Sequence, residues 1–335
     1  MKAFSYFLRT MLLVAILTSC SNKPKIGFLM DTLDIERWQK DKELFEEKVE
    51  ELGGTAMVRI ADGNSPKQLE QAMELIYDKV DVLVVIPVDL YASRDIVKEA
   101  HKKDIPVISY DRMIRDSDVD YYVSADNINI GEQQAQYLSR IASKGNYALL
   151  GGPQKDNNAA LLHLGWMNVL QPLIQKGDIE IVVDQYVENW DADEAYAIMN
   201  DYLNNSSSDL EAIIAGNDEL ASGAIRALQE HNMQREVLVA GQDADLEAIR
   251  NIVAGYQTIT IFKPIEKMAY TAANMAIKLA NEEDPVSTSI TVHNGQKLVP
   301  SVFVSSQVVD SQNIKMTVVS EGYQEEEEIY EYEVD

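Results

Sequence analysis

Short apolar runs alternate with amphipathic stretches along most of the chain. In the first half, apolar runs cover 26–30, 56–60, 82–87 and 107–110, and helical patterns lie between them at about 36–52, 66–79 and 91–103. Strands that are apolar at nearly every position are buried on both faces, which is typical of a parallel sheet covered by helices. The pattern therefore predicts parallel strands linked by crossover helices.

The same alternation starts again near residue 145. Strands are predicted at 147–150, 181–183, 212–215, 237–240 and 258–262, and helices near 157–175, 191–204, 218–231, 245–254 and 265–281. Two successive sets of similar length favour an α/β fold with two doubly wound, Rossmann-like lobes. Eight such units could also close into a single barrel, and the pattern alone leaves this alternative open.

The first nineteen residues have the pattern of a secretory signal peptide. Lys2 and Arg9 precede or flank a short apolar run at 11–17, and small residues lead to Cys20. The run is too short for a bilayer, which requires about 20 apolar residues. Small residues before a cysteine resemble a bacterial lipobox, which implies cleavage after residue 19 and lipidation of Cys20. The protein would then be anchored on the periplasmic side of a bacterial membrane; otherwise Cys20 is an ordinary signal residue.

Charge and length narrow the class of protein. The 335 residues carry a formal charge of −26, and removing Lys2 and Arg9 makes it −28. Such a surface repels phosphate backbones and argues against a nucleic-acid partner. Residues 20–335 are enough for two cores. The glutamates at 325–328, 331 and 333 predict a disordered acidic tail at 324–335.

Polar and indole side chains gather where the predicted strands end. In an open α/β sheet, ligands bind beyond the carboxyl ends of the strands. Asp31, Asp218 and Gln242 follow strands, and Asp218 is interpreted as a helix N-cap. The candidate ligand residues of the two halves are Arg37, Trp38, Asp111, Arg112, Asp156, Asn158, Trp190, Asn217, Asp243 and Lys263.

These residue types fit a monosaccharide. A hydroxyl group is donor and acceptor at once, so carboxylates can accept from it while Arg, Lys or Asn side chains donate to it. The C–H face of a sugar ring packs flat on an indole. A phosphate site would instead need a glycine-rich loop, and Gly151-Gly152 is better interpreted as a tight turn. Trp38 taken alone is better interpreted as a core residue than as a ligand platform, so the argument depends on the whole set of residues.

The same residues lie in motifs through which the chain resembles the type I periplasmic sugar-binding proteins, in their D-xylose-binding family. The order and spacing agree from about residue 25 to 323, which disfavours the barrel. The turn at 152–155 lacks the family's frequent serine, and Glu188-Asn189 replaces its usual Asp-Gly, so pentose selectivity stays open. The motifs are ERWQKD (36–41), VLVVIP (82–87), YDRMI (110–114), GG…DNNA (151–159), QY–V–NW (185–190), NDE…GAI (217–225), GQDADL (241–246) and KPI (263–265).

The resemblance implies a sugar clamped between two lobes that close about a three-stranded hinge. The crossings are expected near 125–130, 260–264 and 290–298. The first lobe would then contain 24–127 and 262–292, and the second 128–261 and 293–323. Trp38 and Trp190 would sandwich the sugar, the cations Arg37, Arg112 and Lys263 would donate to it, and Asp111, Asp156 and Asp243 would accept. Neither a cofactor nor a metal is implied, and the protein would be a monomer.

Two roles follow for such a protein. It would deliver sugar to an ABC importer, or its closed form would be read by a chemoreceptor or a membrane histidine kinase. A glycoside hydrolase or sugar isomerase is disfavoured, because each candidate carboxylate has a cation or amide beside it that keeps it ionised. A repressor of the same fold would need an N-terminal helix-turn-helix, for which no segment is available before residue 25.

Overall fold

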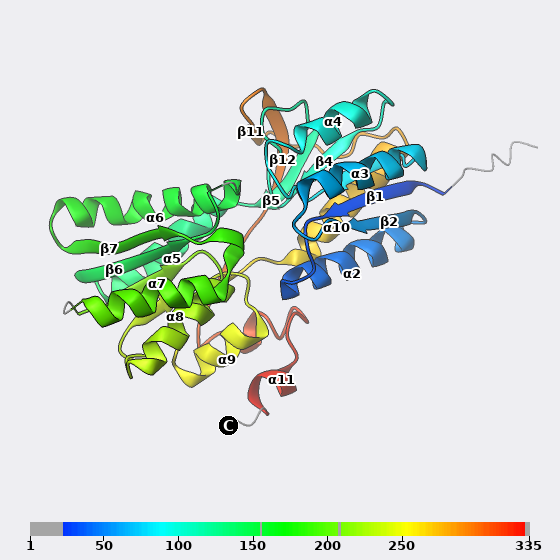
Figure 1. Ribbon diagram of the computed structural model, residues 1–335. Helices are drawn as coiled ribbons and strands as arrows, with labels where there is room; N and C mark the ends of the chain where they lie inside the picture. The colour runs from blue at the N-terminus through cyan, green and yellow to red at the C-terminus, as the bar shows by residue number, and fades with distance from the viewer. Residues whose placement is uncertain (1–22, 155, 207–208, 332–335) are drawn as a thin grey trace, which may run out of the picture.

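Two α/β lobes lie side by side and are joined by crossing segments (Figure 1). The computed structural model describes residues 23–154, 156–206 and 209–331. The first lobe is built on one sheet, in the strand order β11-β12-β5-β4-β3-β1-β2. Its strands are β1 (Lys25–Met30), β2 (Thr55–Ile60), β3 (Val82–Val85), β4 (Val107–Tyr110), β5 (Tyr121–Ala125), β11 (Thr291–His293) and β12 (Leu298–Val304).

Helices cover both faces of this sheet. Successive residues of a strand point to opposite faces. Phe28 of β1 accordingly packs in one apolar cluster with Phe45, and its neighbour Leu29 packs in another with Leu75 and Val97. Both faces of the sheet are therefore buried against helices, as the apolar strand runs predicted. The helices are α2 (Glu36–Glu51) and α10 (Ile265–Ala280) on one face, and α3 (Ser65–Tyr77) and α4 (Arg94–His101) on the other.

The second lobe has a parallel sheet in the order β7-β6-β8-β9. An isolated bridge between Ala240 and Ile259 connects it to the antiparallel pair β10–β13. Its strands are β6 (Gly145–Gly151), β7 (Ile179–Tyr186), β8 (Ala212–Ala215), β9 (Leu238–Ala240), β10 (Thr260–Phe262) and β13 (Gln307–Val309). Its helices are α5 (Asn127–Ile141), α6 (Asn157–Gln175), α7 (Ala192–Asn205), α8 (Asp218–Glu230) and α9 (Leu246–Ala254), with the 3-10 turn η1 (Glu188–Trp190).

The third crossing differs from the expected one. The chain passes between the lobes after β5 and after β10, near the expected positions. β12, however, pairs in parallel with β5, with Ser301 opposite Tyr122. Residues 298–304 therefore belong to the first sheet, and the border expected at 292/293 is corrected to the link between Val304 and Gln307. The pairing gives β5 a neighbour and satisfies backbone groups that an exposed edge would leave open.

The expected disorder of the acidic tail is wrong for residues 324–331. A turn η2 (Ile314–Met316) is followed by a short helix, α11 (Glu326–Tyr330), and Ile329 is fully buried. Two apolar side chains that flank the glutamate run order this segment, because Tyr323 and Ile329 pack in a third apolar cluster. This hinge cluster consists of Ala244, Ile249, Ile252, Phe262, Ile265, Val309, Ile314, Val318, Tyr323 and Ile329.

The predicted signal peptide and Cys20 lie outside the described residues, as do 332–335. Among the residues that the structure describes, none of the helices combines the length and the apolar character needed to cross a bilayer.

Candidate functional site

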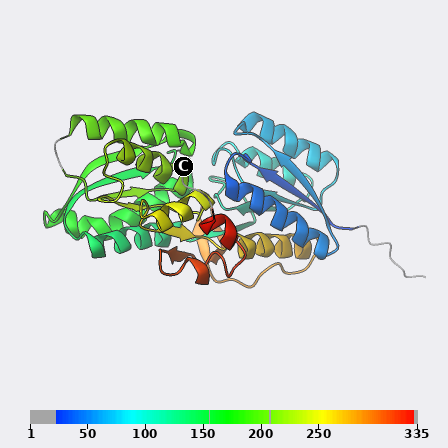
Figure 2. The same ribbon diagram turned by 90° about the horizontal axis from the view of Figure 1, so that it is seen from below.

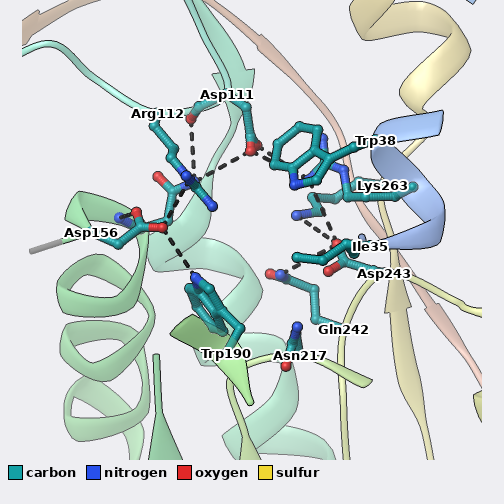
Figure 3. Close-up of a pocket in the computed structure, with 12 residues that line it drawn as sticks. Ile35, Trp38, Asp111, Arg112, Asp156, Trp190, Asn217, Gln242, Asp243 and Lys263 are labelled. Carbon is teal, nitrogen blue, oxygen red and sulfur yellow. Dashed lines mark hydrogen bonds and ion pairs between the residues drawn. The ribbon is translucent and has the colours of Figure 1, made fainter. Parts of the chain in front are cut away.

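One pocket between the lobes brings together all ten predicted ligand residues (Figure 3). Its empty space is about 350 Å³, including the part that opens to solvent. Two further residues line it, Ile35 and Gln242. The sequence had placed Gln242 at a strand end without assigning it to the site, and Ile35 carries no polar signal that could have singled it out.

The carboxyl ends of the two sheets face each other across this pocket. α2 supplies Arg37 and Trp38 in its first turn, and the end of β4 leads to Asp111 and Arg112. From the other side come Asp156 and Asn158 at the start of α6, Trp190 in η1, Asn217 before α8, and Asp243 after β9. Lys263 follows β10 at a crossing. The site is buried, with Arg37 and Asp111 each 2% exposed and Lys263 3%, so the lobes are closed on one another.

Arg37 is the centre of the first-lobe side. Its Nη1 lies 3.3 Å from both carboxylate oxygens of Asp111, and its Nε donates to Asp41 at 3.1 Å. The hydroxyl of Tyr110 donates to the other oxygen of Asp41. The guanidinium lies 4.2 Å from the ring centroid of Trp38. Its Nη2 is buried without a partner, so a fixed donor remains available in the pocket.

Asp243 connects Arg37 and Lys263 across the lobes. Its Oδ1 lies 2.7 Å from Nζ of Lys263 and 3.7 Å from Nη1 of Arg37. Gln242 donates to the same oxygen at 3.5 Å, while its own Oε1 is buried without a partner. This side of the pocket therefore offers an unused acceptor next to a neutralised carboxylate.

Arg112 makes a second connection between the lobes. Its Nη1 donates to Asp31 of the first lobe at 2.5 Å, and its Nε lies 2.9 Å from Asp156 of the second. The indole of Trp190 donates to the same oxygen of Asp156 at 3.3 Å. Figure 3 shows the contacts of Asp156 with Arg112 and with Trp190, on the side of the pocket away from Lys263. Asp31 was noted in the sequence at a strand end, but only the structure shows that it holds Arg112.

The carboxylates of the site are suited to accept hydrogen bonds. Burial by itself raises the pKa of Asp111, but the summed attraction of Arg37, Lys263 and Arg112 outweighs it and leaves that pKa below its ordinary value. Asp111 therefore stays ionised at neutral pH. Asp41 lies deeper, where burial, only partly opposed by Arg37, raises its pKa to about 6.

Two glycines make room for the indole of Trp190. A Cβ atom at Gly152 would lie 2.3 Å from the ring, and one at Gly216 would lie 2.8 Å from it. Trp190 and the preceding Asn189 have φ angles of 57° and 55°, in a region that bulky residues rarely adopt. Such strain persists only where the surroundings enforce it, and it is common at ligand sites. Gly152 and Gly216 thus leave the space that the ring of Trp190 occupies.

The two asparagines of the site also have structural roles. Asn158 accepts from Asn127 at 2.9 Å and donates to the backbone carbonyl of Asp111 at 3.3 Å. Asn217 caps α8, because its Oδ1 accepts from the backbone N–H of Leu220 at 3.0 Å. The expected N-cap at Asp218 is therefore wrong. An N-cap lies just before the first helical residue, and that place belongs to Asn217.

Asp218 lies beneath the pocket. Its carboxylate accepts from Gln257 and Thr260, each at 2.8 Å. Burial, reinforced by the negative charge of Asp243, raises the pKa of Asp218 to about 8. Within the described part of the chain, His, Cys, Asp and Glu side chains form no group arranged to hold a metal ion.

A closed pocket between two α/β lobes, lined by buried ion pairs and two indoles, defines a two-lobed binding protein for a small polar ligand. The model of a periplasmic binding protein domain matches residues 26–284. The chain is 42% identical, over 96% of its length, to the D-xylose-binding periplasmic protein of Escherichia coli K12, and covers 97% of it. It belongs to this xylose-binding family of type I periplasmic sugar-binding proteins.

Further relatives agree. The protein of the same name from Haemophilus influenzae is 42% identical over 91% of this chain and 92% of its own length. Among solved structures, an ABC transporter solute-binding protein from Clostridium phytofermentans with bound β-D-glucose has a TM-score of 0.85 and 27% identity. The matched region covers 91% of this chain and 99% of that protein. A carbohydrate transporter solute-binding protein from Chloroflexus aurantiacus, in complex with D-glucose, has a TM-score of 0.85 and 30% identity, with 92% of this chain and 98% of that one covered. The predicted fold class is confirmed, and these relatives are named as binding proteins rather than enzymes.

Proposed function

We propose that the protein binds D-xylose in the pocket between its closed lobes. The observation that carries the proposal is a closed pocket with polar atoms that lack partners. Nη2 of Arg37 and Nε1 of Trp38 are buried donors, and Oε1 of Gln242 is a buried acceptor. Buried polar groups left unpaired cost free energy, and sugar hydroxyls would satisfy them. The names of the relatives that are 42% identical support D-xylose as the sugar.

The roles of the side chains follow from their places. Trp38 and Trp190 lie on opposite sides of the pocket (Figure 3) and would cover the apolar faces of the ring. Arg37, Arg112 and Lys263 donate, and the three aspartates that they balance accept, namely Asp111, Asp156 and Asp243. Only the closed form contacts the sugar from both lobes, so the sugar stabilises that form.

The bound sugar is then delivered to the permease of an ABC importer. The transporter role of the solved relatives supports this. In this role the protein acts as a monomer and returns its sugar chemically unchanged. Ionised, cation-paired carboxylates such as Asp111 support binding over general acid catalysis. Incubation with D-xylose or an aryl xyloside, followed by chromatography, should recover only the starting compound; any product would contradict a pure binding role.

Export and anchoring complete the proposal. Signal-like residues 1–19 followed by Cys20 support a lipidated first residue in the mature protein. In cells given labelled palmitate, the wild-type protein should carry the label and sediment with membranes. Cys20→Ser should lose the label. Equal labelling of both proteins would contradict the anchor.

Calorimetry and thermal unfolding with a panel of pentoses and hexoses test sugar binding directly. D-xylose should bind with one site per chain and raise the melting temperature. Trp190→Ala or Asp111→Ala should remove both effects while the proteins stay folded by circular dichroism. If no sugar of the panel binds the wild-type protein, the ligand class is wrong.

A further inference from the structure

The last described part of the chain crosses the junction of the lobes. Residues 310–331, here called the C-terminal strap, run from the end of β13 through α11. Figure 2 shows the strap, orange to red, beneath the junction and next to α9 and α10. The strap supplies Ile314, Val318, Tyr323 and Ile329 to the hinge cluster, so its position is determined by packing.

The strap is attached to the second lobe. Arg250 of α9 donates to the carbonyl of Glu328 from both Nε and Nη2, at 2.9 and 2.7 Å. Ile329 packs in the same cluster as Ile249 and Ile252 of α9. Both polar and apolar contacts therefore connect the strap to α9.

Gln324 of the strap holds the backbone next to a ligand residue. Its Nε2 donates to the carbonyl of Ala244 at 3.0 Å. Ala244 and the preceding Asp243 have φ angles of 60° and 103°, a conformation that needs support from its surroundings. Further support comes from Thr260, whose Oγ1 accepts from the N–H of Ala244 at 3.1 Å. The strap thus helps fix the carboxylate that pairs with Lys263.

Tyr323 of the strap meets the first lobe. Nζ of Lys40 in α2 donates to the carbonyl of Tyr323 at 2.7 Å and lies 4.1 Å from its ring centroid. Lys40 is one helical turn from Arg37 of the pocket. The ring of Tyr323 also packs against Phe262, 5.0 Å between centroids, just before Lys263. Lys40 and Tyr323 therefore join the lobes outside the sugar pocket.

We propose that the C-terminal strap is a positioning element of the binding site: Gln324 fixes Asp243, and the contact of Lys40 with Tyr323 favours the closed form. The proposal rests on the sugar binding proposed above. Contacts present only in the closed form add to the affinity for any ligand that requires closure. The strap should therefore raise sugar affinity although no part of it lines the pocket.

Lys40→Met tests this, with Lys42→Met as the matched control. Lys42 lies on the same helix and, among the residues that the structure describes, pairs with Glu46 of that helix at 2.6 Å. By calorimetry, Lys40→Met should raise the Kd for D-xylose about tenfold, the size expected for one lost charged hydrogen bond. Lys42→Met should leave the Kd unchanged, and Lys40→Arg should restore most of the affinity. The melting temperature without sugar should be the same in the three variants.

Gln324→Leu gives an independent readout. This change keeps the volume of the side chain and removes its donor, so the Kd should rise while circular dichroism and the sugar-free melting temperature stay close to wild type. If Lys40→Met and Gln324→Leu both bind D-xylose like Lys42→Met, the strap has no positioning role. If the wild-type protein itself binds no sugar, the proposed function fails, and the strap proposal fails with it.

Discussion

The indole of Trp190 rests on the backbone of Gly152, where even a methyl group would overlap the ring. Gly152→Ala should therefore displace the indole and weaken D-xylose binding about a hundredfold, measured by calorimetry. Gly151→Ala is the matched control, since its Cβ would meet the side chain of Tyr186, outside the pocket, at 3.2 Å. If Gly152→Ala and Gly151→Ala bind D-xylose with equal affinity, Trp190 does not contribute to sugar binding.

Changes in tryptophan fluorescence on adding sugar should come from the two tryptophans that line the pocket. Trp38 and Trp190 line it, whereas Trp166 is fully buried in the second lobe and donates to Gln134 at 2.7 Å. Trp166→Phe should keep the full spectral change on adding D-xylose. The prediction is wrong if this variant binds sugar by calorimetry but shows little spectral change.

The contacts of Arg112 with both lobes depend on the forked shape of its guanidinium group. Two different nitrogens reach Asp31 and Asp156, one carboxylate on each lobe. Lysine offers a single point charge and cannot match both. Arg112→Lys should therefore raise the Kd about tenfold, with a faster dissociation rate in stopped flow. Arg59→Lys, at a surface pair with Glu74, serves as control and should bind like wild type.

Asp218 should make stability depend on pH. Because its pKa is raised to about 8 in the folded protein and is about 4 in an unfolded chain, the folded protein holds an extra proton between these values. The free energy of unfolding therefore falls as the pH rises through that window, by up to about 1.4 kcal/mol per pH unit. Asp218→Asn should lose less stability from pH 6 to pH 8 in urea unfolding. Parallel curves for the two proteins would contradict the assignment.

Most strands of the central sheets and most residues of the pocket could be predicted from the sequence, for related reasons. Strands buried on both faces are apolar throughout, so β3 (Val82–Val85) and β8 (Ala212–Ala215) stand out as runs. Polar residues directly after such runs lie at the carboxyl edge of the sheet by topology alone. The resemblance then selected among them, and the structure places all ten in one pocket.

What was missed depends on contacts between distant segments. β12 (Leu298–Val304) is half-buried and ambiguous in pattern, and only its pairing with β5 assigns it to the first lobe. Tyr323 and Ile329 are single apolar residues beside a run of glutamates, so composition indicated disorder, whereas packing against α9 and Phe262 decided the outcome. Asp31 contributes to the site by accepting from Arg112, which is 81 residues away in the sequence.

The helices α2, α6, α8 and α10 all begin at the pocket, next to Arg37, Asp156, Asn217 and Lys263. Each helix start presents the positive end of its dipole, roughly half a unit charge. Together with the three cations, these dipoles offset the carboxylates gathered there, even though the chain as a whole is strongly acidic. A neutral sugar thus enters a field that is already balanced, and binding displaces few mobile ions. Affinity should accordingly change little between dilute buffer and high salt, unlike that of a site built to capture an ion.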